Sequence, residues 1–151
     1  MHAVPIACGG FLFAVLWFDL MFDVQVLRHR DADVPEPVLG SIAAYYRRVT
    51  IEASPMGHAV GLVMLVGIVA LVFQWIAGSV PLWASLASLV LVLPPVALAA
   101  IRVVPSAMRL GRRTDPIDVQ SALARRICRD HFLCLAGVLG FLAVQLVAAS
   151  G

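Results

Sequence analysis

All positively charged residues of this chain are arginines, and they are confined to two windows, Arg28 to Arg48 and Arg102 to Arg129. Four apolar segments flank these windows, at about residues 3–27, 56–77, 80–101 and 130–149. Each segment is close to the roughly 20 residues that an α-helix needs to cross about 30 Å of hydrocarbon. The pattern predicts a polytopic membrane protein with four transmembrane helices.

Composition supports this class. Hydrophobic residues make up 62% of the 151 residues and charged residues only 13%, which leaves too little polar surface for a water-soluble globule. Four spans in a chain of this length leave room only for short connections. We therefore expect an all-α fold, a four-helix bundle that forms a single integral membrane domain over residues 1–151.

The distribution of arginine also predicts an orientation. The first window holds four arginines and the second holds seven, whereas the termini and the turn between the second and third spans hold none. By the positive-inside rule, segments 28–55 and 102–129 should be cytoplasmic and both termini outside. The complete absence of lysine, with abundant Ala, Val, Leu and Arg, is typical of a GC-rich genome, and we expect a bacterial inner membrane.

The two cytoplasmic segments resemble each other weakly. Glu36-Pro37 and Asp115-Pro116 each precede an arginine pair, and an acidic residue beside a proline is typical of a helix start. Each half would then contain one outgoing helix, a link and one returning helix, which makes a 2+2 parallel internal repeat. Chance similarity between two arginine-rich segments is an equal alternative.

The two halves are expected to differ in their links. Ser54-Pro55 interrupts the first link, so residues 37–52 should form a short interfacial helix before the second span, with Tyr45 and Tyr46 at the membrane interface. The second half can run as one helix from about residue 116 to 147. Trp75 and Trp83 flank a Gly-Ser-Val-Pro turn, which predicts a tight hairpin between the second and third spans.

Small residues and prolines indicate where helices meet or bend. Gly57 and Gly61 form a GxxxG step, which predicts a helix contact face. Pro94-Pro95 falls near the middle of the third span. Proline removes amide donors, so this helix should kink or open toward a cavity.

Ionisable residues recur at one depth, near the cytoplasmic ends of the spans. They are Asp19, Asp23, His58, Arg102 and His131. Such residues are costly inside a membrane and usually face the interior of the bundle. Because Asp19 and Asp23 are four residues apart, both carboxylates should point along one helical face. A structural clamp between carboxylate and arginine is the plain alternative to a functional acid–base pair.

We take Asp19, Asp23, His58 and His131 as candidate catalytic residues. His58 and His131 begin the two returning helices at similar depth, so they could face each other and ligate a haem or a metal ion. Arg102, Arg109 and Glu52 are candidate ligand contacts. The alternative for each histidine is a hydrogen bond to a neighbouring helix or to a lipid headgroup.

Several chemistries lack their signatures in the sequence: CxxC, a glycine-rich phosphate loop, HExxH and a serine elbow. Arginines beside a membrane are explained first by topology and then by anionic headgroups, so we expect lipid partners and no nucleic acid.

Three functions remain open. The first is a polar pocket in the cytoplasmic leaflet that binds or acts on a small lipophilic ligand such as a quinone, a haem or a lipid. The second is a small transporter that carries a proton or cation on Asp19. The third is a non-catalytic accessory subunit of a homo-oligomer or larger membrane complex. The sequence favours the pocket, because polar residues of four helices reach one depth, and leaves open whether the protein is an enzyme.

Overall fold

The computed structural model describes residues 2–29, 32–52 and 54–150, and within these ranges it contains helices and no strand. The α-helices are α1 (Ala3–Asp23), α2 (Glu36–Arg47), α3 (Ser54–Ile76), α4 (Leu82–Leu98), α5 (Val104–Arg112) and α6 (Ile117–Ser150). A 3₁₀ segment over Val24–Arg28 extends α1, and π-helical segments over Arg48–Glu52 and Ala99–Val103 follow α2 and α4.

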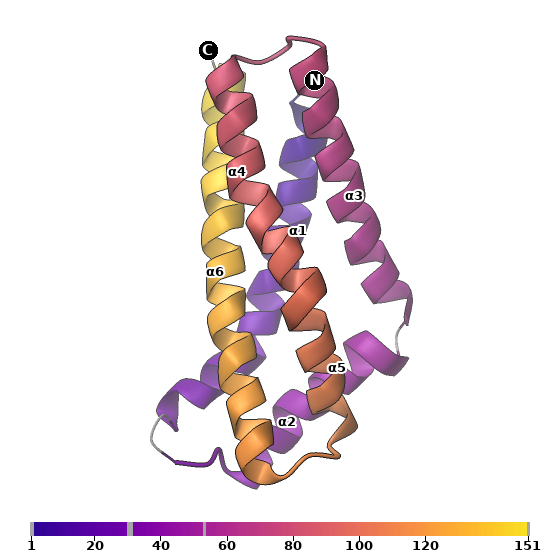
Figure 1. The fold of residues 1–151 in the computed structure, drawn as a ribbon, viewed down its shortest axis with the longest axis vertical. Helices are drawn as coiled ribbons and strands as arrows, with labels where there is room; N and C mark the ends of the chain where they lie inside the picture. Colours follow the sequence, from indigo (N-terminus) through magenta and orange to yellow (C-terminus); the bar gives the residue numbers. More distant parts are fainter. Residues whose placement is uncertain (1, 30–31, 53, 151) are drawn as a thin grey trace.

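Four helical segments are long and apolar enough to cross a membrane: Ala3–Arg28, Pro55–Ile76, Leu82–Arg112 and Ile117–Ser150. The predicted four-helix membrane bundle is therefore confirmed. Within it, α1 and α4 each contact both α3 and α6, and the two ends of the chain lie at the same end of the bundle (Figure 1). The internal repeat stays a prediction.

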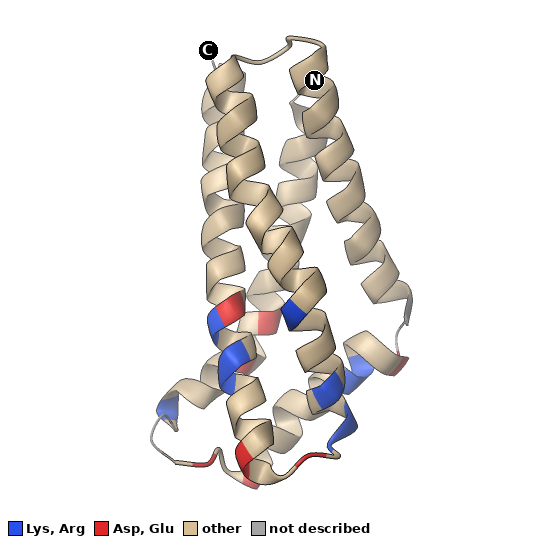
Figure 2. Cartoon of the chain, in the orientation of Figure 1, with Lys and Arg blue, Asp and Glu red and all other residues tan. Residues whose placement is uncertain are grey.

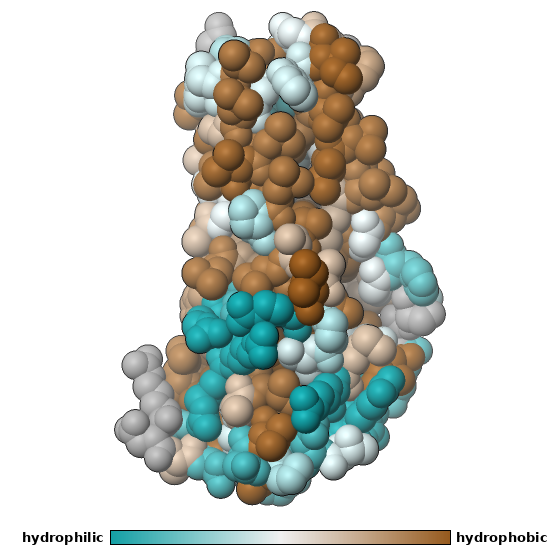
Figure 3. Space-filling model, viewed as in Figure 1, coloured by the Kyte–Doolittle hydropathy of each residue, from teal (hydrophilic) through white to brown (hydrophobic). Residues whose placement is uncertain are grey.

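Charge divides the bundle into two ends. Acidic residues and arginines gather at the end opposite the termini (Figure 2), which we call the charged end. On the face seen in Figure 3, apolar side chains cover the upper part and hydrophilic side chains form patches toward the charged end. A surface that is apolar at one end and charged at the other suits a chain that is embedded in lipid and emerges on one side.

The two longest helices extend beyond the bilayer at the charged end. α6 has 34 residues, which corresponds to about 51 Å at 1.5 Å per residue, so the predicted uninterrupted helix from 116 to 147 is confirmed. The third span was expected to end near residue 101. The helix itself continues through the π-helical segment Ala99–Val103 into α5 as far as Arg112, past the expected end of the span.

α2 runs obliquely across the charged end of the bundle (Figure 1). It buries Leu39, Ile42, Ala43 and Tyr46, a spacing of three and four residues that lines one helical face. This face packs in a core that includes side chains of α5 and α6. The short helix expected over 37–52 is thus present, but its apolar face contacts the protein rather than a lipid interface.

The close helix contacts differ from the expected ones. A side chain added at Gly57 or Gly61 would meet no atom within 4 Å, so the predicted GxxxG contact face is not used within this chain. A close approach between membrane-length helices occurs at Gly137 of α6 instead, where a Cβ atom would lie 2.8 Å from the Leu91 carbonyl oxygen of α4. Only glycine permits this approach, one turn before the proline pair.

The uncharged end is closed by a tight hairpin and a buried set of amides. Gly78, at φ +58°, forms the turn between α3 and α4 as predicted. Gln74 donates to the Gln145 side-chain oxygen at 3.4 Å, and Gln145 donates to the Ser88 hydroxyl at 2.9 Å. We call Gln74, Ser88 and Gln145 the glutamine clamp, because it joins α3, α4 and α6.

Candidate functional site

Two carboxylates of α1 point into the charged end of the bundle. Asp19 and Asp23 lie on one helical face, as their spacing predicted. Asp23 is 0% exposed and the Asp19 side chain is 14% exposed. A buried carboxylate is expensive unless it is paired, so their partners define the site.

The His131 imidazole lies between these two carboxylates. Its Nδ1 atom is 2.6 Å from Asp23 Oδ2, and its Nε2 atom is 3.6 Å from Asp19 Oδ2. The residue is only 4% exposed. The sequence-based expectation that these three residues share one depth therefore becomes direct contact between α1 and α6.

Two tyrosines of α2 complete the group. Tyr45 donates to Asp19 Oδ1 at 2.7 Å, and Tyr46 donates to Asp23 Oδ1 at 2.6 Å. The Tyr45 ring also stacks on Phe22, with centroids 4.2 Å apart. We call Asp19, Asp23, Tyr45, Tyr46 and His131 the polar cluster.

Burial fixes the protonation of both phenols. Removal from water is the main effect that raises the pKa of Tyr45 and the pKa of Tyr46 well above the ordinary range. The negative charges of the two aspartates raise both pKa values further. Both tyrosines are therefore hydrogen-bond donors at every physiological pH.

Asp23 sets the orientation of the histidine ring. One of its oxygens accepts from Tyr46 and the other accepts from His131 Nδ1. Since a carboxylate on one ring nitrogen fixes the tautomer and the direction of the other, Nε2 is directed toward Asp19. The arrangement can hold a proton on His131 or pass it to Asp19.

A cavity of about 170 Å³ adjoins the cluster. Asp19, Tyr45, Tyr46 and His131 contribute to its wall, and most of the remaining wall is apolar, with residues of α1, α3, α4 and α6 such as Leu12, Val60, Met64, Val92, Pro95 and Val138. Pro95 of the proline pair lines this cavity, within a continuous α4. An apolar chamber with a few convergent polar groups is the usual form of a small-molecule site.

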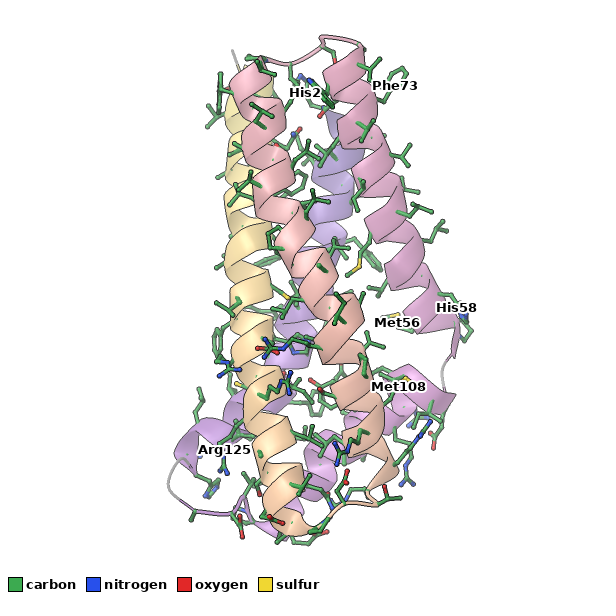
Figure 4. All side chains as sticks on the ribbon, viewed as in Figure 1. His2, Met56, His58, Phe73, Met108 and Arg125 are labelled. Atoms are coloured by element: carbon green, nitrogen blue, oxygen red, sulfur yellow. The ribbon has the colours of Figure 1, made fainter. Side chains whose placement is uncertain are left out.

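The exposed lining residues of the cavity lie at the start of α3 and the start of α5, from which we infer that the cavity opens there. Three of its lining residues, Met56, Gly57 and Val104, are themselves exposed, with Met56 at 45% and Val104 at 47%. Met56 points into the space between α3 and α4 in Figure 4. All three belong to segments long and apolar enough to cross a membrane.

His58 lies outside the cluster. It is exposed at the start of α3 and points away from the bundle (Figure 4), whereas His131 is buried on α6. The two imidazoles therefore do not face each other. Glu52 is also exposed, at the end of the π-helical segment that precedes α3.

The two candidate arginines have other partners. Arg102 Nη2 is 3.1 Å from Asp130 Oδ2, and Arg129 and Arg126 approach the same buried carboxylate at 3.5 and 4.0 Å. Arg109 forms a bidentate pair with Asp115, and its Nη2 is 2.7 Å from the carboxylate. Neither Arg102 nor Arg109 lines the cavity.

The residues present do not fit a haem. Ligation by both histidines would need His58 inside the bundle, and the cavity is close to the roughly 150 Å³ that accommodates a single benzene ring, far smaller than a porphyrin. Among the described residues, no group of three or more His, Cys, Asp or Glu side chains is arranged to hold a metal ion.

The tyrosines are the site residues that sequence reasoning missed. A sequence signal for Tyr46 does exist, since it falls seven residues after Leu39, four after Ile42 and three after Ala43, which places it on the buried face of α2. The signal does not say what the face packs against. Tyr45 carries no comparable signal.

Comparison of the chain with protein-family models, with curated proteins and with solved structures finds no match. The function is therefore inferred from the geometry of the cluster and its cavity.

Proposed function

We propose that the protein binds a small lipophilic molecule in this cavity, holds its polar head at the polar cluster, and exchanges a proton with it through Asp19 and His131. The observation that carries the proposal is a cavity with mostly apolar walls whose polar side chains include two carboxylate-bonded phenols, a carboxylate and an imidazole. By the positive-inside rule, the charged end faces the cytoplasm of a bacterial inner membrane, so the site lies in the cytoplasmic leaflet.

The position of the opening supports a ligand that comes from the bilayer. Met56, Gly57 and Val104 line the cavity and are exposed on membrane-length segments. A molecule dissolved in the lipid reaches such an opening without crossing a polar surface. A ligand confined to water would have to enter the hydrocarbon first.

The roles of the cluster residues follow from their contacts. His131 is the proton-exchanging group, because imidazole is the side chain that most readily changes charge near neutral pH. Asp19 borders the cavity beside it and accepts the proton or the ligand's hydrogen bond. Asp23 and the two tyrosines position these groups, since their hydrogen bonds are made within the cluster.

Transport of a proton or cation on Asp19 is less well supported. A path across the membrane would have to pass the uncharged end, where Leu71, Val92 and Phe141 pack together and the glutamine clamp joins three helices. An accessory subunit would need contact faces but no cavity bordered by ionisable groups.

The arginines of the charged end have a separate role in this proposal. Arg126 and Arg129 approach Asp130, yet their side chains remain 47% and 66% exposed. They are free to contact anionic headgroups, each worth about 1 kcal/mol near a charged surface.

Photolabelling tests whether a lipophile occupies the cavity. The full chain in lipid nanodiscs is irradiated with a trifluoromethyl-phenyl diazirine, a single-ring lipophile, and labelled residues are located by mass spectrometry. We expect label at cavity residues such as Cys134, lost in Ala99→Phe, whose ring fills the cavity, and retained in Ala97→Phe, which faces outward from the same helix. Label that is confined to lipid-exposed residues such as Ile101, equally in both variants, would contradict the proposal.

A further inference from the structure

The hydrogen-bond donors of the polar cluster are already used within the protein. Tyr45 and Tyr46 donate to the two aspartates, and His131 Nδ1 bonds to Asp23. Thr50, which also lines the cavity, donates to the Tyr46 carbonyl oxygen at 2.6 Å. The cluster therefore has no hydroxyl donor to spare for a ligand.

Two atoms beside the cavity keep unused bonding capacity. Asp19 Oδ2 and His131 Nε2 are 3.6 Å apart, longer than the roughly 2.7–3.2 Å of a good N–H···O hydrogen bond. A carboxylate oxygen can only accept. The imidazole nitrogen accepts when the ring is neutral and donates when it is charged. A ligand hydroxyl suits this pair because it can donate to Asp19. Its oxygen can also accept from His131 when the ring is charged, and the hydroxyl places no competing hydrogen against Nε2 when the ring is neutral.

Other head groups fit less well. A ketone oxygen would face the Asp19 carboxylate with no hydrogen between them, and a ligand carboxylate would add a third negative charge. A ligand cation is not required when His131 is protonated, because the imidazolium then lies between Asp19 and Asp23. The favoured head is therefore uncharged and donates a hydrogen bond.

Size limits the body of the ligand. The cavity of about 170 Å³ is close to the volume that takes one benzene ring. Its opening at Met56, Gly57 and Val104 leaves room for a chain to extend into the lipid. The cavity is bordered mainly by Val, Leu, Met and Pro side chains, which offer an apolar ring no polar partner away from the cluster.

We infer that the site selects an uncharged single-ring lipophile with a phenolic hydroxyl, which bridges Asp19 Oδ2 and His131 Nε2 while its alkyl chain leaves through the opening toward the bilayer. A quinol head is one member of this class. The inference rests on the proposed function and narrows its ligand to hydrogen-bond donors.

Competition against the diazirine label tests it with matched ligands. The probes are para-pentylphenol and its methyl ether para-pentylanisole, which keeps the ring and chain but cannot donate. Both are corrected for their partition into nanodiscs without protein. We expect the phenol to compete at no more than about one tenth of the concentration that the ether requires. A hydrogen bond to a charged group stabilises a complex more than a bond to a neutral group does. Equal competition by the ether overturns the inference, while cavity labelling still supports the proposed function.

Two further ligands and one variant sharpen the result. Stronger competition by para-pentylbenzylamine would assign a cation site instead, and stronger competition by para-pentylbenzoate would assign an anion site. In Asp19→Asn the preference for phenol over ether should fall to less than about threefold, while the exposed Asp118→Asn should keep it. Should Asp19→Asn fail to fold, the phenol and ether comparison on the native chain decides alone.

Discussion

The polar cluster and the glutamine clamp are both buried polar sets that join three helices, but they differ in chemistry and surroundings. The clamp uses neutral amides and a hydroxyl, and none of its three residues lines the cavity. The cluster combines two carboxylates, an imidazole and two phenols, and four of its five residues border a cavity. The clamp can only hold helices together, whereas the cluster can also change charge and meet a ligand.

This difference separates structural polar groups from functional ones in a membrane domain. Neutral interhelical hydrogen bonds are modest in lipid, because the separated helices find other partners. Charged groups at membrane depth cost more and are retained where they serve a purpose. Matched substitutions at the two ends of the bundle measure the contrast.

The largest expected effect is on stability at Asp23. Asp23→Asn keeps the side-chain size but replaces one acceptor oxygen by a donor, so one existing bond is lost: either the Tyr46 hydroxyl must turn its hydrogen away or His131 must take the other tautomer. We expect a loss of about 3 kcal/mol in the free energy of unfolding. Unfolding in mixed micelles, followed by circular dichroism, measures it.

The matched substitution is Gln145→Leu in the glutamine clamp, which removes the hydrogen bonds of Gln145 to Gln74 and Ser88 at similar side-chain size. A loss of about 1 kcal/mol is expected there, in line with interhelical hydrogen bonds in other membrane proteins. If both variants lost the same stability, the cluster would be no more than a second clamp.

The sequence predicts the architecture because membrane topology depends on local sequence features, such as the length of an apolar segment and the position of arginines. The arginine windows, Ser54-Pro55 and the Trp-flanked turn each mark a boundary, and the resulting helices are present. Asp19 and Asp23 were placed together by their spacing alone. These inferences need only the period of one helix and the thickness of a bilayer.

The rest depends on how the helices are rotated and packed. α3 is apolar on all sides, so hydropathy does not say which face turns inward, and His58 lies with the exposed Leu62 and Leu65. The sequence places Tyr46 at the membrane interface, whereas it packs in a core with α5 and α6. That packing is a tertiary contact, which the pattern of α2 alone does not predict. Arg102 pairs with Asp130 of α6, a tertiary contact that the spacing within one helix does not predict.

An intermediate effect is expected at the opening of the cavity. Gly57→Trp places an indole at the opening, where a new side chain meets no other atom within 4 Å. We expect the rate of diazirine labelling within the cavity to fall roughly tenfold, since entry must wait for the indole to move. The glutamine clamp, far along α3, should be unaffected.

Gly61→Trp provides the control, because Gly61 is equally exposed and unobstructed one turn further along α3 but does not line the cavity. Equal labelling rates in the two variants would show that ligands enter by another path.

The smallest expected effect concerns the ionisation of the two tyrosines, which can be measured only in alkali. The chain has two tyrosines, and both belong to the cluster, so tyrosinate absorbance reports on that region alone. Because burial and the aspartate charges raise both pKa values, the folded protein should show almost no tyrosinate at about pH 10, where half of ordinary phenols are ionised. Protein unfolded in detergent should titrate normally.

The raised pKa values of the tyrosines also make the free energy of unfolding depend on pH. Around pH 10 the folded state binds more protons than the unfolded state, so the free energy of unfolding is at its full value below the ordinary phenol pKa and falls as the pH rises toward the folded values. The glutamine clamp has no group that titrates and contributes nothing to this decline. Half-ionisation of the folded protein near pH 10 would mean that water reaches the phenols, and that the bonds which orient Asp19 and Asp23 toward His131 are open in solution.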